Sequence, residues 1–213
     1  AGVLSGSGGP IRRAMLPAEC LPELPPDKAI QPGQKQALYR RILQLGISGL
    51  TEACEAAKIE AATPLFLAVP EQRCGRPFPV LEHILKDLNN AVEYPIDLVT
   101  SRVFPAGRAG GFKALSEACN LLLTTSLEKI IVGGVDSFYD AMLLKKLDAE
   151  KRMSGKNSMD GFVPGEGAAF VVLQKAVLQK TAQSTLVIHT PSETSESGHF
   201  YSEESCLGVG LSS

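Results

Sequence analysis

The side-chain types that commonly act as nucleophiles or metal ligands are sparse in this chain and do not gather into a compact motif. Cysteine occurs at positions 20, 54, 74, 119 and 206, an odd number without a Cys-x-x-Cys pair. This spacing excludes a zinc ribbon and a thioredoxin-type motif, and it does not predict a disulfide framework. Histidine occurs at positions 83, 189 and 199, without metal-ligand spacing. We therefore expect reduced thiols, no metal site and no cofactor.

Two segments carry a more specific pattern of glycines and acidic residues. The first, Ile130–Ser137 (IIVGGVDS), predicts a buried strand whose paired glycines allow another backbone to approach closely. The second, Asp160–Leu173 (DGFVPGEGAAFVVL), predicts a sharp turn with an acidic side chain inside it, followed by a buried strand. From these residues alone, Glu166 is expected to accept hydrogen bonds from loop amides in a structural turn.

A glycine-rich stretch near the N-terminus does not predict a nucleotide site. Val3 and Leu4 form a short apolar start, and Gly6–Pro10 follows as a turn. A dinucleotide-binding loop needs Gly-x-Gly-x-x-Gly, but Ile11 stands at the third glycine position and no Gly-Lys-Ser/Thr sequence follows. The pattern therefore indicates a first strand and its turn.

The elements that must position these residues alternate between helices and strands along the chain. Apolar spacing predicts helices at about 34–58, 81–88 and 112–122, and strands at 65–69, 96–104, 129–132, 167–174 and 185–189. This alternation indicates an α/β fold with a mostly parallel, mixed sheet and helices on both faces. We expect one domain over residues 1–213, with an irregular Pro-rich excursion at 17–33 and a C-terminal extension at 175–213.

Composition narrows the classes of function. The 213 residues are 44% hydrophobic and 21% charged, with a formal net charge of −2. A chain without a basic surplus is not expected to bind nucleic acid. Its apolar runs fall far short of the roughly 18 residues that span a bilayer, and no secretion signal opens it, so we expect a cytoplasmic protein without a membrane span.

The segments VGGVDSF and DGFVPGEGAAFVVL together resemble the β-ketoacyl synthases of the thiolase superfamily, over about Asp97–Leu173. The resemblance implies a thiolase-like half and a condensing enzyme that acts on acyl-carrier-protein or acyl-CoA thioesters, without a cofactor. In such enzymes a cysteine at a strand-to-helix elbow takes the acyl group, because a helix N-terminus favours its thiolate. The resemblance also implies binding roles for Phe162 and Glu166.

The expected nucleophile position of the family does not hold a cysteine here. It corresponds to Arg108, which stands 25 residues before Gly133. The elbow around it comprises Gly107, Ala109, Gly110, Gly111 and Phe112. Cys119 follows on the predicted apolar helix face and is expected to be buried and inert.

Two interpretations remain open at this stage. The chain is either a β-ketoacyl synthase-like protein of fatty acid or polyketide synthesis that is incomplete or catalytically degenerate, or a non-catalytic chain-length-factor-like or scaffolding subunit that binds an acyl-carrier partner. The family repeats its α/β half twice and takes catalytic basic residues from the second, so we expect an N-terminal portion. We also expect a homo- or hetero-dimer that buries the strand edge at Leu98–Phe104.

Overall fold

The computed structural model describes residues 5–6, 9–24, 37–71, 83–155, 161–175, 187–188, 191 and 194. The helical elements are η1 (Ala18–Cys20), α1 (Ala37–Ala56), α2 (Ile84–Ala91), η2 (Gly107–Ala109), α3 (Gly110–Thr124) and α4 (Ala141–Ala149). The strands are β1 (Ser5–Gly6), β2 (Gly9–Pro10), β3 (Leu65–Ala68), β4 (Arg102–Phe104), β5 (Lys129–Ser137) and β6 (Glu166–Gln174). No helix in these described parts is long and apolar enough to cross a membrane.

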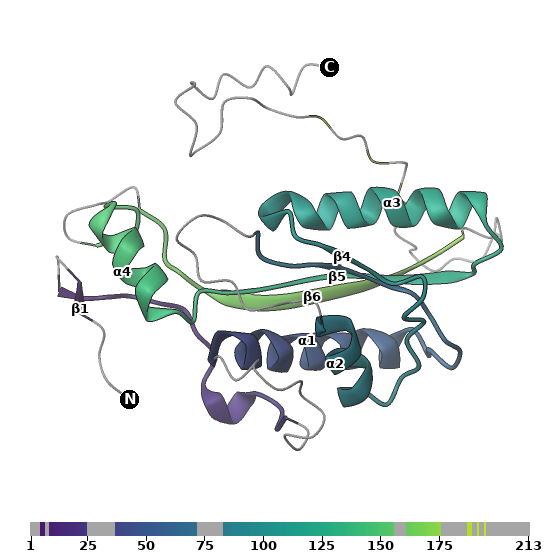
Figure 1. Ribbon diagram of the computed structural model, residues 1–213, viewed down its shortest axis with the longest axis horizontal. Coiled ribbons are helices and arrows are strands. Elements are labelled where there is room, and N and C mark those ends of the chain that lie inside the picture. Colours follow the sequence, from purple (N-terminus) through teal and green to yellow (C-terminus); the bar gives the residue numbers. More distant parts are fainter. Residues whose placement is uncertain are drawn as a thin grey trace.

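A four-stranded sheet in the order β4-β3-β5-β6 forms the centre of the fold. β3 is parallel to β4 and to β5, whereas β6 is antiparallel to β5 along its full length, from Lys129↔Gln174 to Ser137↔Glu166. Helix α3 covers one face of the sheet, and α1 and α2 cover the other (Figure 1). The predicted α/β fold with a mostly parallel, mixed sheet and helices on both faces is confirmed.

Alternating strand residues divide the core between the two faces, as the two-residue period of a strand requires. Leu65 and Leu67 of β3 pack with α1 and α2 in the larger cluster. Phe66, between them in sequence, packs with Ala114 and Ala118 of α3 on the opposite face. Each strand therefore contributes to both hydrophobic layers, which explains why the strand sequences are almost continuously apolar.

Two glycines explain how the last strand packs closely against its neighbours. The ring of Phe170 in β6 lies against Gly133 of β5, where an added Cβ would come within 2.0 Å of the ring carbon Cδ1. The other edge of the same ring faces Gly49 of α1, where a Cβ would lie 2.9 Å from Cδ2. The paired glycines of β5 are not equivalent, because a Cβ on Gly134 would meet Ala68 at an ordinary 3.5 Å.

The predicted strand at 96–104 was too long. Residues 97–101 form a turn in which an Asp97 carboxylate oxygen accepts hydrogen bonds from the amides of Val99 and Thr100. The Ser101 amide donates to the Asp97 carbonyl. Because the aspartate and this carbonyl bind the following amides locally, β4 begins only at Arg102.

The apolar face predicted for α3 is only partly the buried one. Its buried residues include Ala114, Ala118 and Leu122, whereas Phe112 is 68% exposed and Cys119 is half-buried. The small side chains of Ala114 and Ala118 let the helix lie close to the sheet, and Leu115 and Leu122 pack in the same cluster. Phe112 lies outside this contact.

Several predicted features lie outside the described residues. These include the start of the first strand at Val3 and Leu4, the beginning of the long helix at 34–36, and most of the strand predicted at 185–189. The described part of the N-terminal region forms a two-stranded sheet in which Ser5 pairs with Pro10, separate from the main sheet. Only residues 17–24 of the Pro-rich excursion are described, so its extent stays a prediction.

Candidate functional site

The strand-to-helix elbow predicted from the sequence is present at the carboxyl end of β4. The chain leaves β4 at Phe104, forms the short helix η2, and enters α3 at Gly110. Gly107 has a φ of +53°, a conformation that favours glycine, and an added Cβ there would lie 3.1 Å from Glu71. At Gly110 a Cβ would lie 2.9 Å from the Phe104 carbonyl oxygen. Two elbow glycines are thus required by the local geometry.

Arg108 occupies the tip of this elbow. Arg108 lies in the middle of η2, just before the first turn of α3, and is exposed to solvent. Ala109, the N-cap residue of α3, makes no side-chain capping bond. The amino-terminal end of a helix carries a partial positive charge, so Arg108 and the helix end together present positive charge at this edge of the sheet.

None of the described cysteines lies at the elbow. Cys119 is eleven residues beyond Arg108 on α3, and burial raises the pKa of its thiol. Cys54 is fully buried on α1, on the other face of the sheet, and burial raises the pKa of its thiol to about 11. A raised thiol pKa is the opposite of what a cysteine nucleophile needs. Cys20 lies in η1, far from the elbow in sequence, whereas Cys74 and Cys206 fall outside the described residues.

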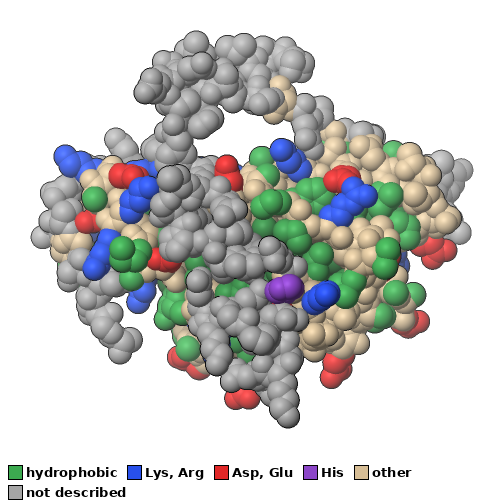
Figure 2. Space-filling view, viewed as in Figure 1, with side chains coloured by type: hydrophobic (Ala, Val, Ile, Leu, Met, Phe, Trp, Pro, Cys, Tyr) green, Lys and Arg blue, Asp and Glu red, His purple; other side chains and the backbone are tan. Residues whose placement is uncertain are grey.

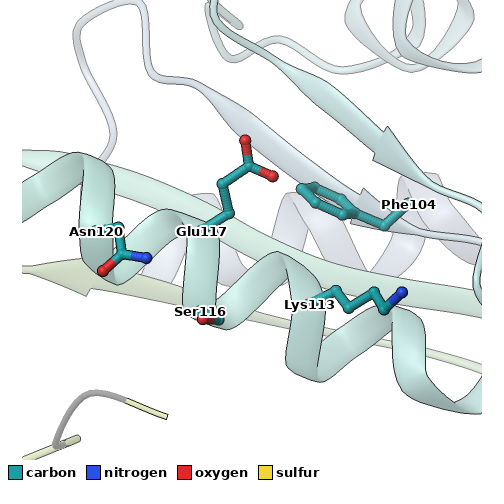
Figure 3. Close-up of a pocket in the computed structure, with 5 residues that line it drawn as sticks. All are labelled: Phe104, Lys113, Ser116, Glu117 and Asn120. Atoms are coloured by element: carbon teal, nitrogen blue, oxygen red, sulfur yellow. The ribbon is translucent and has the colours of Figure 1, made fainter. Parts of the chain in front are cut away.

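An open groove of about 450 Å³ lies between β4 and α3 (Figure 3), lined by Phe104, Lys113, Ser116, Glu117 and Asn120. The carboxylate of Glu117 and the ring of Phe104 lie next to one another in this view. On the face seen in Figure 2, basic and acidic side chains lie among apolar ones in the region where Figure 1 shows α3. The groove therefore offers an aromatic floor with mixed polar walls.

An arginine of the edge strand ties the two sides of this groove together. Arg102 forms an ion pair with Glu117, and its guanidinium lies 5.7 Å from the centroid of the Phe66 ring. Phe66 in turn contacts Phe104, with 5.5 Å between the ring centroids. These contacts fix the orientation of the aromatic floor.

A second polar group lies at the carboxyl end of β5, where Glu166 begins β6. Its carboxylate accepts hydrogen bonds from Arg41 Nε at 2.8 Å, from Ser137 Oγ at 2.8 Å and from the Leu16 amide at 2.8 Å. The Arg41 side chain also donates to the Leu16 carbonyl and lies 5.2 Å from the centroid of the Tyr139 ring. The Glu166 side chain is fully buried in this group.

The hydrogen bonds at Glu166 outweigh its burial. Burial alone would raise the pKa of the carboxyl group, but the donors Arg41, Ser137 and Leu16 favour the ionised form and lower the pKa below its usual value. The same pairing raises the pKa of Arg41 against the opposing effect of its own burial. The pair is therefore ionised at neutral pH.

The family model described as "Beta-ketoacyl synthase, N-terminal domain" matches residues 102–178. This match includes the elbow, the paired glycines and Glu166. The segment is β-ketoacyl synthase-like. No curated protein shows a significant match to the chain.

One similar solved structure is titled "AbyA1 - tetronic acid condensing enzyme". It is 18% identical, with a TM-score of 0.39, over 66% of this chain and 38% of that chain. The chain thus spans less than half the length of that structure.

The β-ketoacyl synthase-like segment holds the elbow residues, Phe162 and Glu166, but it does not bring them into one site. Arg108 follows the end of β4, at one edge of the sheet, whereas Glu166 begins β6, at the opposite edge. Phe162 packs edge-on against Phe138, with 5.5 Å between centroids, and its backbone bonds to Arg152 and Ser154. The binding roles of Phe162 and Glu166 stay predictions.

Among the described loop amides, that of Leu16 donates a hydrogen bond to Glu166. Glu166 also accepts hydrogen bonds from Arg41, a residue that the sequence analysis did not identify. Arg41 lies on α1 between Leu38 and Leu45, within the apolar spacing of that helix, and is only 7% exposed. A charged residue at a buried helical position needs a partner of opposite charge. That signal could have pointed to an acidic partner, although not to Glu166 in particular. Within the described residues, no cluster of three or more His, Cys, Asp and Glu could hold a metal ion.

Proposed function

We propose that the chain is a β-ketoacyl synthase-like subunit, related to acyl-thioester condensation in fatty acid or polyketide synthesis, that does not itself form an acyl-cysteine intermediate. The observation that carries this proposal is the exposed Arg108 at the tip of the elbow. A guanidinium stays protonated at physiological pH and cannot attack a thioester carbonyl. The raised thiol pKa of Cys119 supports the same conclusion.

The elbow keeps features that suit an anionic or polar part of an acyl-thioester ligand. Arg108 and the amino-terminal end of α3 both favour negative charge, such as a carboxylate or the phosphate of a phosphopantetheine arm. We therefore propose that an acyl-carrier protein or an acyl-CoA thioester is the partner of this subunit, in the cytoplasm. Binding without covalent transfer is the role expected of a chain-length-factor-like or scaffolding subunit.

Covalent labelling separates this proposal from a catalytic one. The chain is incubated with an acyl-CoA, with cerulenin or with iodoacetamide, and modified cysteines are located by peptide mass spectrometry. We expect no acylated cysteine, and alkylation by iodoacetamide first at the exposed Cys20 among the described thiols. A stable acyl group on any cysteine of the native chain would contradict the proposal.

Restoring a thiol at the elbow gives a positive control. The substitution Arg108→Cys places a thiol next to the first turn of α3, where its thiolate is favoured. Lys145→Cys, in the middle of α4, is the matched control because Lys145 is also exposed and does not line the groove. We expect alkylation at position 108 to exceed alkylation at position 145 about tenfold near neutral pH, since a helix N-terminus lowers a thiol pKa by a unit or more. Equal rates would show that this elbow does not activate a thiol.

We also propose that two copies associate through the edge of β4 that pairs with no other strand in the described part of the chain. The Phe104 carbonyl accepts a hydrogen bond from Val69 after β3, so the polar groups of Val103 point toward the open edge. Pro105 has no amide hydrogen, and the Ser101 amide already donates to Asp97. Val103 is therefore the natural centre of an antiparallel pairing between two copies.

This register makes the groove complementary to itself. Arg102 of one copy then lies opposite Phe104 of the other, and Lys113 comes level with Glu117 of the second copy, because α3 runs back along β4. Opposite charges at this distance favour the pairing and fix its register. The side chains that line the groove of one copy therefore face the side chains that line the groove of the other.

Sedimentation of charge variants tests the association. We expect wild-type protein to be dimeric and Lys113→Glu to weaken the dimer about tenfold, with Lys145→Glu on the exposed face of α4 as the control. A wild-type chain that stays monomeric at high concentration, or equal effects of the two variants, would contradict the arrangement.

A further inference from the structure

The segment Ile11–Pro17, here called the N-terminal strap, crosses the carboxyl end of the sheet between the small β1–β2 sheet and η1 (Figure 1). The Ala14 amide donates to the Pro164 carbonyl at 2.8 Å, and the Leu16 amide donates to Glu166 at 2.8 Å. The Leu16 carbonyl accepts a hydrogen bond from Arg41. The strap is thus bound through its backbone to β6, to the turn before it and to α1.

The side chains of the strap contribute little to its attachment. Most of them are exposed, including Leu16 at 45%, and only Ile11 and Met15 are half-buried. Beneath the strap, Ser137 and the side chain of Glu166 are both fully buried. A segment with few apolar contacts that covers buried polar groups belongs to the low-stability end of a fold.

The groups beneath the strap remain paired when it leaves. Glu166 keeps its hydrogen bonds from Arg41 and from Ser137, and these two side chains come from α1 and β5 rather than from the strap. Opening therefore leaves no buried charge without a partner, and the freed strap amides become hydrated. The two states differ by a few backbone hydrogen bonds, by the contact of Ile11 with the apolar cluster around α4, and by the exposure of one ion pair.

We propose that the N-terminal strap is a hinged cover that opens as a unit while the rest of the fold stays intact. Opening uncovers the Arg41–Glu166 pair and Ser137 at the carboxyl end of the sheet, the end at which open α/β sheets bind ligands. The elbow with Arg108 lies at this same end. The strap therefore controls access to charged groups that the closed form buries.

Hydrogen exchange followed by mass spectrometry tests this proposal on the full chain. Leu16→Pro removes the amide hydrogen that is donated to Glu166 and leaves the hydrogen bonds of Glu166 with Arg41 and Ser137 in place. We expect peptides from the strap to exchange at least about fivefold faster in this variant, the change that follows from losing one net hydrogen bond. Peptides from β3 and α3 should keep the exchange rates of the wild type.

Arg13→Pro is the matched control, since it introduces the same ring at a strap position whose amide makes no hydrogen bond in the described structure. It should leave strap exchange within about twofold of the wild type. The proposal is overturned if Leu16→Pro accelerates β3 and α3 as much as the strap, or if the two proline variants behave alike. It is also overturned if the wild-type strap exchanges only at the rate of global unfolding.

Discussion

Replacing Gly133 by alanine tests the close packing between β5, β6 and α1. The new Cβ would stand 2.0 Å from one carbon of the Phe170 ring, whereas ordinary contact begins at about 3.4 Å. The ring would have to move by more than an ångström, and the backbone of α1 at Gly49 closes the opposite side. Relief must therefore come from a shift of β6 or of the helix.

The expected loss of stability follows from two opposing effects. Overpacking a core by one methyl group costs about 1–3 kcal/mol, and alanine recovers about 0.4–1 kcal/mol by restricting the unfolded chain. Because the ring is confined on both edges, we expect a net loss near 2 kcal/mol for Gly133→Ala. In a chain of this size that loss lowers the melting temperature by roughly 4–8 °C. Urea unfolding followed by circular dichroism measures it directly.

The neighbouring glycine supplies the control, and the ring supplies the rescue. Gly134→Ala meets Ala68 at an ordinary 3.5 Å and should change stability by less than about 0.5 kcal/mol. In a Phe170→Leu background, Gly133→Ala should cost less than half of its cost in the wild type, because the ring is gone. Equal costs for the two alanine substitutions, or equal costs in the two backgrounds, would refute the packing argument.

Three further predictions concern the buried ion pair and the elbow helix. Arg41→Met leaves the Glu166 carboxylate buried without its charged partner and should cost about 3–5 kcal/mol in urea unfolding. The pKa of Glu166 is lower in the folded chain than its usual value of 4.5, so the stability gained from its ionised carboxylate is present above pH 4.5 and is lost as the pH falls through the folded pKa. The acid side of a stability-against-pH curve should therefore be flatter for Glu166→Gln. Gly111→Ala, which meets no atom within 4 Å, should raise stability by about 0.5–1 kcal/mol, whereas Gly110→Ala should lower it because its Cβ strikes the Phe104 carbonyl. Melting curves of the two alanine variants that shift in the same direction would contradict this last prediction.

The sequence predicted the helices and strands well where their patterns depend on the chain nearby. The apolar run at 65–69 matches β3, and the long helix predicted at 34–58 matches α1 over its described part. The apolar run at 129–132 and the pattern of Ile130–Ser137 together match β5, which ends at Ser137. The antiparallel pairing of β5 with β6 could not be predicted, because pairing with a distant strand leaves no local signal.

The candidate site was predictable in part for the same reason. Counting from Gly133 located an elbow at Arg108, and the structure has a strand-to-helix turn there. Arg41 could not be matched to Glu166, since 125 residues separate them and only the fold brings α1 against β6. On α3 the predicted Leu122 is buried, whereas Phe112 is exposed, because the helix contacts the sheet through Ala114 and Ala118.

The alignment of β6 on β5 has a consequence for how the chain reaches its native state. Moving β6 by a single residue along β5 would turn every one of its side chains to the opposite face of the sheet. The Glu166 carboxylate would then face α3 instead of Arg41, and Phe170 would leave its place between Gly133 and Gly49. Both errors are penalised only once α1 is in position against the sheet. The helix that comes early in the sequence thus acts as a template that rejects misaligned pairings of the strand that comes late.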